Sequence, residues 1–213
     1  MYRLYDFLPS GNGYKVRLLL TQLEILFERV ELDILKGETR TPEFLVKNPN
    51  GRIPVLEFQP GQFLAESNAI LFYLSEGTEY LSADRLERAR VMQWLFFEQY
   101  SHEPNIATSR FWISHLDITD ELKKALEQKR KLGYAALEVM EQHLRNHNFF
   151  VAERYTIADI ALYAYTHVAH EGGFALNGFP GIQAWLERVK AQPRHISITQ
   201  ACGWKESTTA QHS

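Results

Sequence analysis

The chain has 213 residues, of which 45% are hydrophobic and 23% are charged, an ordinary composition for a globular protein. The formal net charge of -3 gives no indication of a nucleic-acid or anionic-membrane partner. No apolar run reaches the roughly 18 residues of a membrane span, and we find no apolar signal region at the N-terminus. The single cysteine, Cys202, excludes an internal disulfide. We therefore expect a cytoplasmic protein, in which the thiol for any thiol chemistry comes with the substrate.

The first part of the chain, up to about Glu76, alternates short strand-like and helix-like segments. Apolar patterns predict strands at 2–6, 27–32, 54–58 and 62–65 and helices at 15–23, 42–46 and 67–75. Gln59-Pro60-Gly61 is a turn signal between the last two strands and predicts a hairpin. The resulting βαβαββα order predicts a mixed sheet covered by helices.

After Gly77 the strand signals stop, and a short linker over 77–81 leads into a helical region. Apolar periodicity predicts helices at 82–115 (bent near Pro104), at 120–143, from 156 onward and at 180–191. Thr156 and Asp159 have the spacing of a capping box, so we assign them to structure. We predict a first domain at 1–76, an all-helical domain at 82–204 and a loose tail at 205–213.

The Ile53-Pro54 step, at the end of the run N-P-N-G-R-I-P over 48–54, is a candidate ligand site. A cis bond here, opening a strand, would turn the N–H and C=O of Ile53 outward, where an extended peptide can pair with them. Most X-Pro bonds in folded proteins are trans, so an ordinary trans bond is the alternative.

The Glu66-Ser67 step is a second candidate. A helix that begins at Ser67 would present its hydroxyl and N–H at an end of positive partial charge, which binds carboxylates. Glu66 could accept an ammonium group there, so the pair suits the α-amino acid end of a peptide. The alternative for Ser67 is a plain helix N-cap. Lys36, Thr39 and Arg52 are candidates to meet a second carboxylate, with solvated surface as the alternative.

Ser10 and Asn12 lie in a glycine-containing loop between the first strand and the first helix. Glycines at such a point let the backbone approach a ligand closely, and a hydroxyl there could donate to a thiolate. A turn composed of ordinary turn formers is the alternative. No G-x-S-x-G elbow surrounds Ser10, which argues against a serine nucleophile.

The helical region is rich in aromatic residues, some of which could line an apolar cleft facing the first domain instead of forming core. Phe111 and His115 belong to this group. The histidines lack a metal-site spacing with acidic partners, so we expect no metal.

Taken together, these features resemble a cytosolic glutathione transferase of bacterial type over nearly the whole chain. The matching segments are S-G-N-G-Y-K-V at 10–16, the run at 48–54, E-S-N-A-I at 66–70, F-E-Q-Y-S-H-E-P at 97–104 and the box at 156–159. The resemblance implies a thioredoxin-like N-terminal domain, a C-terminal helical bundle and a homodimer. It also implies glutathione as co-substrate, with no cofactor, held by the backbone of Ile53 beside Pro54 and by Glu66 and Ser67.

In the family, catalysis rests on a Tyr, Ser or Cys after the first strand, and Ser10 is the best match here. Some bacterial branches have a Thr and an Asn at the places of Ser10 and Asn12, so Asn12 could share or own the role. Related sequences often carry Cys where Gly13 stands. The absence of a cysteine at this position argues against a protein thiol in this loop. We expect the cleft for the second substrate to be lined by the helical domain and by Tyr14.

The expected activity is attack of the glutathione thiolate on an electrophilic, largely apolar co-substrate. Two alternatives stay open. One is glutathione-dependent reduction of disulfides or peroxides. The other is a non-catalytic binding or assembly module that keeps the fold.

Overall fold

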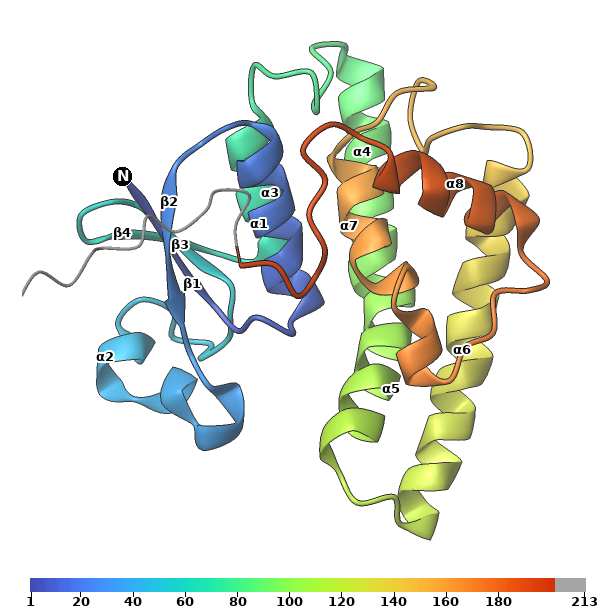
Figure 1. Ribbon diagram of the computed structural model, residues 1–213, viewed down its shortest axis with the longest axis horizontal. Coiled ribbons are helices and arrows are strands. Elements are labelled where there is room, and N and C mark those ends of the chain that lie inside the picture. The colour runs from blue at the N-terminus through green and yellow to red at the C-terminus, as the bar shows by residue number, and fades with distance from the viewer. Residues whose placement is uncertain (202–213) are drawn as a thin grey trace, which may run out of the picture.

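The computed structural model describes residues 1–201, which form a sheet-containing unit and a helical unit side by side (Figure 1). The predicted tail at 205–213 and the predicted domain end at 204 lie outside the described residues. The sheet lies at the left of Figure 1, and the long helices of the second unit stand at the right. This arrangement of a small mixed sheet next to a helical bundle confirms the predicted fold class.

The sheet contains β1 (Tyr2–Asp6), β2 (Phe27–Glu31), β3 (Val55–Gln59) and β4 (Gln62–Ala65). The strands lie in the order β2-β1-β3-β4. β1 pairs in parallel with β2, whereas β3 is antiparallel to both β1 and β4. Leu4 of β1 and its partner Leu56 of β3 are fully buried, so the middle of the sheet belongs to the core.

Three helices belong to the first unit: α1 (Gly11–Gln22), the short α2 (Pro42–Leu45) and α3 (Ser67–Ser75). α1 begins four residues earlier than predicted. Ser10 is its N-cap, and the Ser10 hydroxyl oxygen accepts a hydrogen bond from the Gly13 N–H at 3.3 Å. Glycine and asparagine are poor helix formers, so their presence in the first turn hid the helix start from the apolar pattern.

The second unit contains α4 (Arg85–Phe97), α5 (Glu103–His115), α6 (Asp120–Leu144), α7 (Ile157–Thr166) and α8 (Pro180–Lys190). The predicted helix over 82–115 is interrupted by a π-helical turn at Glu98–His102. Pro104 is the second residue of α5, and it cannot donate the backbone hydrogen bond that a continuous helix would have at this point. The predicted bend near Pro104 stays a prediction, and the π-helical turn directly precedes the proline.

α7 lies at the centre of the molecule, and every one of its residues is buried. The predicted capping box at its start is confirmed: Asp159 accepts from the Thr156 N–H, and Thr156 accepts from the Ala158 N–H. Asp159 also accepts from the Trp185 indole N–H of α8 at 3.0 Å. The Asp159 carboxylate therefore caps α7 and also links α7 to α8.

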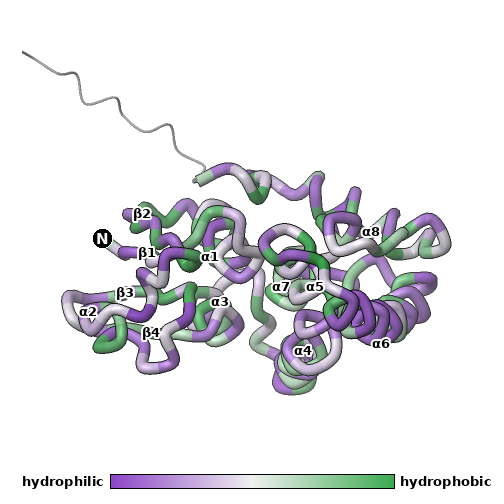
Figure 2. Tube along the Cα trace, turned by 90° about the horizontal axis from the view of Figure 1, so that it is seen from below, coloured by the Kyte–Doolittle hydropathy of each residue, from purple (hydrophilic) through white to green (hydrophobic). Residues whose placement is uncertain are grey.

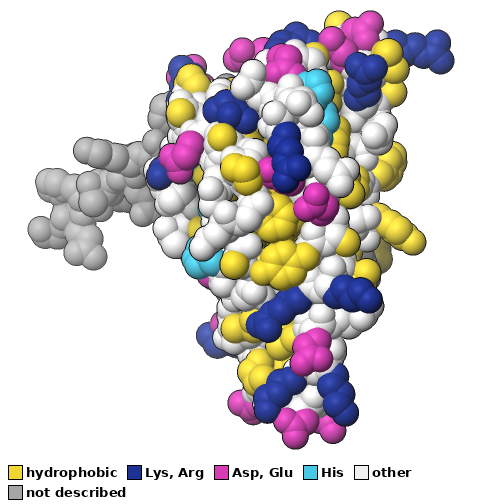
Figure 3. All heavy atoms as spheres, turned by 90° about the vertical axis from the view of Figure 1, so that its right-hand side faces the viewer, with side chains coloured by type: hydrophobic (Ala, Val, Ile, Leu, Met, Phe, Trp, Pro, Cys, Tyr) yellow, Lys and Arg dark blue, Asp and Glu magenta, His cyan; other side chains and the backbone are white. Residues whose placement is uncertain are grey.

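Seen from below, α1 and α3 lie between the sheet and the helices of the second unit (Figure 2). α1 packs against both α3 and α7, so the two units share one apolar core. The face formed by α6 and α8, on the far side from the sheet, carries charges of both signs interspersed with hydrophobic side chains (Figure 3). Among residues 1–201, no helix has the length and apolar character that crossing a membrane requires.

Candidate active site

A cleft of about 600 Å³ opens where the two units meet. One wall comes from the first unit, through the loop before α1 and the loops at 34–40 and 51–53. The other wall is one face of α5, together with Tyr165 of α7. The lining residues of α5 recur at helical spacing: Glu103, Ala107, Thr108, Arg110, Phe111, Trp112, Ser114 and His115.

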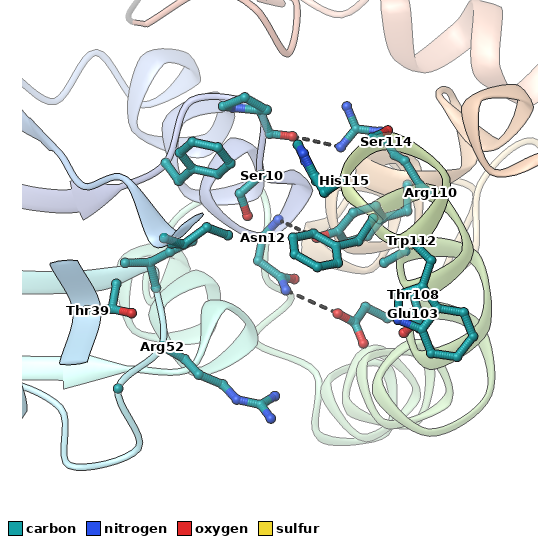
Figure 4. A pocket seen from close by; sticks show the side chains of 18 of the residues that line it. Ser10, Asn12, Thr39, Arg52, Glu103, Thr108, Arg110, Trp112, Ser114 and His115 are labelled. Atoms are coloured by element: carbon teal, nitrogen blue, oxygen red, sulfur yellow. Dashed lines mark hydrogen bonds between the residues drawn. The ribbon is translucent and has the colours of Figure 1, made fainter. Parts of the chain in front are cut away.

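Ser10 and Asn12 both line the cleft, at the N-terminus of α1. The Asn12 amide nitrogen Nδ2 donates to Glu103 Oε1 of α5 at 3.2 Å, and the two side chains point toward each other across the cleft (Figure 4). The helix dipole makes this end of α1 favourable for negative charge. The structure thus brings together the hydroxyl, the amide and the helix end that the sequence suggested.

Tyr165 of α7 lines the cleft beside these residues. Its hydroxyl oxygen accepts a hydrogen bond from the Asn12 backbone N–H at 3.2 Å. Burial raises the pKa of Tyr165 far above its usual value, so the phenol keeps its proton near neutral pH. A β-carbon on Gly11 would lie 2.5 Å from the Tyr165 ring, so glycine at this position is what lets the ring approach α1.

Arg110 of α5 fixes the loop that carries Ser10. Its Nη1 donates to the Pro9 carbonyl oxygen at 2.7 Å (Figure 4), and its Nε donates to Glu171 at 2.6 Å. The guanidinium therefore joins the second unit to the residue just before Ser10. Charge-assisted hydrogen bonds of this kind are stronger than neutral ones and give a defined geometry.

The Ile53–Pro54 peptide bond is cis, as the sequence suggested. Arg52 and Ile53 line the cleft, whereas Pro54 is buried behind them. Thr39 also lines the cleft and is almost fully buried. Lys36 does not line the cleft. Its side chain is 76% exposed and pairs with Asp33 on the protein surface.

Glu66 and Ser67 lie at the start of α3, next to the cleft but outside its lining. Glu66 has φ of +67°, a left-handed conformation that costs of order 1–3 kcal/mol in a non-glycine residue and is typical of functional sites. The buried Ser67 hydroxyl donates to Asn12 Oδ1 at 3.2 Å. Its hydrogen is therefore already used, which leaves the N–H groups of the first α3 turn to meet a carboxylate.

The prediction that Tyr14 lines the cleft is wrong. Tyr14 is fully buried, and its hydroxyl donates to the Ile196 carbonyl oxygen at 2.8 Å and lies 3.2 Å from His195 Nε2. The reason is the early start of α1. Two residues along a helix place side chains on nearly opposite faces, so Asn12 faces the cleft and Tyr14 faces the core.

Sequence reasoning missed several lining residues, above all Glu103, Arg110 and Tyr165. Glu103 and Arg110 share one face of α5 with Phe111 and Ser114, so helical spacing of polar residues was a signal that could have found them. Nothing local marks Tyr165, because it reaches the site through the packing of α7 on α1.

Comparisons with known proteins agree with this architecture. Residues 1–76 match the family model "Glutathione S-transferase, N-terminal domain", and residues 93–193 match "Glutathione S-transferase, C-terminal domain". A glutathione S-transferase structure from Pseudomonas fluorescens [Pf-5] is 50% identical and superimposes with a TM-score of 0.92, covering 93% of this chain and 99% of that one.

Two further relatives differ in what their names state. The disulfide-bond oxidoreductase YfcG of Escherichia coli (strain K12) is 31% identical, covering 91% of this chain and 92% of that protein. The structure of Ure2p in complex with S-hexylglutathione is 25% identical with a TM-score of 0.84, covering 93% of this chain and 98% of that chain. The two solved structures thus share the arrangement of a sheet domain and a helical bundle with this chain. The chain belongs to the glutathione S-transferase family.

Proposed function

We propose that the cleft binds glutathione and activates its thiol as a thiolate, which attacks an electrophilic, largely apolar co-substrate. The observation that carries this proposal is the meeting of Ser10, Asn12 and the N-terminus of α1 on one wall of the cleft. The chain has a single cysteine, Cys202, which lies outside the described residues. No cysteine lies among residues 1–201, so in this proposal the reacting thiol is that of glutathione.

The energy that this activation needs is modest. A free thiol has a pKa near 8.5 and is only slightly ionised at neutral pH. Lowering that pKa by about 2 takes about 2.7 kcal/mol of preferential stabilisation of the thiolate. A hydroxyl, an amide N–H and a helix N-terminus are together sufficient, since hydrogen bonds to a charged acceptor contribute about 1.5–3 kcal/mol each.

The rest of the tripeptide would lie along the first unit. The backbone of Ile53 would pair with the extended peptide, and the start of α3 with Glu66 would hold the α-amino acid end. Arg52 and Thr39, both in the cleft lining, would meet the second carboxylate. The complex of Ure2p with S-hexylglutathione supports this proposal, because that relative has the same fold.

The second substrate would occupy the α5 side of the cleft. Phe111 and Trp112 supply apolar surface there, and His115 stands at the end of the same wall. Once both partners are bound, the rate would come from thiolate formation and from proximity of the thiolate to the electrophilic carbon.

The experiment is a pH titration of thiolate absorbance for glutathione bound to the wild type and to the Ser10→Ala and Asn12→Ala variants. We expect a lowered thiol pKa in the wild type and a rise of about 1 in whichever variant removes the dominant donor. Tight binding of glutathione with a thiol pKa near 8.5 in all three proteins would favour a non-catalytic binding module instead.

Glutathione-dependent disulfide reduction is the second candidate, and the charge of the cleft favours it. Arg40, Arg52 and Arg110 all line the cleft; with Arg52 assigned to the first glutathione and Arg110 paired with Glu171, Arg40 is left to hold a carboxylate of a second peptide. In that reaction two glutathione thiols are oxidised to one disulfide while the substrate disulfide is reduced to two thiols. The relative YfcG is named a disulfide-bond oxidoreductase. Parallel assays with a glutathione mixed disulfide and a chlorinated nitroaromatic separate the two reactions.

We also propose that two copies of the chain pair through α3 and α4. A hollow of about 410 Å³ between these helices is lined by Phe72, Met92 and Phe96, and Phe96 is 66% exposed in one chain. Large exposed apolar side chains around a hollow are typical of an interface. We expect a dimer in analytical ultracentrifugation and a monomer for Phe96→Asp. A Leu86→Asp control, at another exposed apolar position of α4, separates this site from general loss of apolar surface.

A further inference from the structure

A buried ion pair crosses the junction of the two units behind the cleft. Lys15 of α1 and Glu98 of the π-helical turn have fully buried side chains, and Lys15 Nζ lies 2.9 Å from Glu98 Oε1. Neither residue lines the cleft. Removing two charges from water is costly, and replacing such a pair by apolar residues is often neutral or stabilising. The pair therefore needs an explanation other than stability.

Glu98 faces inward with Trp94 and Leu95 of α4, from which it is separated by four and three residues, and it is the first residue of the π-helical turn. Within Glu98–His102 the first and last residues are fully buried, whereas Gln99 and Tyr100 are exposed. Single π-helical turns inside helices often mark functional positions. Glu98 Oε2 also accepts from the Asn68 amide at 2.9 Å, so the same carboxylate holds the first turn of α3.

A chain of hydrogen bonds leads from this ion pair to the cleft. Lys15 Nζ donates to Ser67 Oγ at 3.3 Å. Ser67 Oγ donates in turn to Asn12 Oδ1 at 3.2 Å, and Asn12 Nδ2 donates to Glu103 Oε1 at 3.2 Å. Three helices, α1, α3 and α5, thus meet in one polar chain that ends at the candidate thiol site.

The direction of this chain is fixed by Lys15. An ammonium group can only donate, so the Ser67 oxygen must accept from it. The single Ser67 hydroxyl hydrogen then points at Asn12. The amide oxygen of Asn12 accepts this hydrogen bond. The amide NH₂ of Asn12 consequently turns the other way, toward Glu103 and the cleft (Figure 4).

We propose that Lys15 and Glu98 are positioning residues that keep the NH₂ group of Asn12, rather than its oxygen, facing the glutathione sulfur. The inference rests on the proposed function. An NH₂ group stabilises a thiolate by donating a hydrogen bond, whereas a flipped amide would present a partly negative oxygen to it. Lys15 supplies the direction, and Glu98 balances the buried charge of Lys15.

The test removes both charges at once, because a variant that leaves one buried charge unpaired is prone to unfold. In the variant Lys15→Met, Glu98→Gln, we expect the pKa of the bound glutathione thiol to rise by about 1. The affinity for glutathione, measured at a pH where the thiol is protonated, should change less than about threefold, since the wall of the cleft is retained.

A cycle with Asn12→Ala separates positioning from direct attraction between the Lys15 charge and the thiolate. The variant Lys15→Met, Glu98→Gln is called the charge-free variant. If Lys15 acts through Asn12, adding its two substitutions to Asn12→Ala should leave the thiol pKa at the value of Asn12→Ala alone. Additive rises in thiol pKa would overturn the proposal, because they would mean that Lys15 acts on the sulfur independently of the amide.

Ser67 provides a second route that holds even if the charge-free variant does not fold. Ser67→Ala breaks the chain with the ion pair intact and should raise the thiol pKa, and Ser67→Thr keeps the hydroxyl and should restore it. A wild-type thiol pKa near 8.5 would contradict the proposed function itself. A lowered wild-type value that neither Ser67→Ala nor the charge-free variant changes would overturn this inference and leave the proposed function standing.

Discussion

His102 is a histidine that the fold keeps neutral. Its side chain is fully buried in the π-helical turn, and Nε2 lies 2.9 Å from Thr166 Oγ1. Its Nδ1 has no hydrogen-bond partner among residues 1–201. Burial lowers the pKa of His102 to about 4, an effect that neighbouring Glu98 opposes and neighbouring Lys15 reinforces. The folded protein therefore binds a proton at His102 less readily than the unfolded chain does.

This difference predicts an acid-sensitive fold. Below pH of about 6.5 the unfolded chain takes up a proton at this histidine, and the folded protein does so only near pH 4. The stability contribution of neutral His102 is thus present above pH 6.5 and is lost as the pH falls toward 4, by about 3 kcal/mol. In urea unfolding, His102→Gln should lose less stability than the wild type between pH 7 and pH 4. Parallel curves for the two proteins would contradict the prediction.

Arg110 joins α5 to the Pro9 carbonyl beside Ser10. Lysine keeps the charge but lacks the forked geometry, so Arg110→Lys should let the Ser10 loop move. We expect kcat/KM with glutathione to fall by about tenfold or more, because small misplacements of reacting groups are costly. Arg90→Lys, at an exposed position of α4, is the control. Equal kcat/KM for both variants would show that the Pro9 contact has no role.

Among the elements, α7 depends on its capping box more than a surface helix would. Thr156→Ala removes one cap and should cost about 1–2 kcal/mol. Asp159→Ala also leaves the buried donors of Thr156, Phe150 and Trp185 without their acceptor, so it should cost about 3 kcal/mol or more. Urea denaturation of both variants measures the difference. A cost for Asp159→Ala no greater than that for Thr156→Ala would show that the tie to α8 contributes nothing.

Elements with strong local signals were predictable from the sequence. Turn residues and period-two patterns located β4 at the predicted 62–65, and the residues that begin α3 and α6 were also predicted. The start of α1 was not, because Gly11 and Gly13 disfavour helix locally and so hid the Ser10 N-cap at which the helix begins. The π-helical turn has no local signal either, since an ordinary helix accommodates the same residues.

The residues of the candidate site also fall into those that the sequence predicted and those that it did not. The segments that carry Ser10, Asn12, Thr39, Arg52 and Ile53 lie between or at the ends of predicted strands and helices, so the motif order sufficed to bring these residues together. Long-range packing decides the rest. The pairing of Lys15 with Glu98 joins positions 83 residues apart, and neither shows its partner in the sequence.

At the scale of the whole molecule, the chain returns from the helical unit to the first unit through residues 191–201. Arg17 of α1 is fully buried and pairs with Asp6 at 2.8 Å. Its guanidinium also donates to the carbonyl oxygens of Ile198 at 3.2 Å and Gln200 at 2.5 Å. The segment is therefore fastened to the back of α1, on the side away from the cleft, where Tyr14 meets Ile196.

Arg17→Lys tests this fastening. Lysine can balance Asp6 but cannot reach both carbonyl groups at the same time, so the segment over 191–201 should open locally. Limited proteolysis should then cut within residues 191–201 in the variant, whereas the wild type resists cleavage there. Cleavage at the same sites and rates in both proteins would contradict the prediction.

The proposed function requires glutathione to bind with its sulfur at the N-terminus of α1. A crystal structure of the protein with glutathione tests it most directly. We predict the sulfur within hydrogen-bonding distance of Ser10 Oγ or Asn12 Nδ2, with the peptide backbone along Ile53. Glutathione bound with its sulfur away from both groups, at full occupancy, would contradict the account.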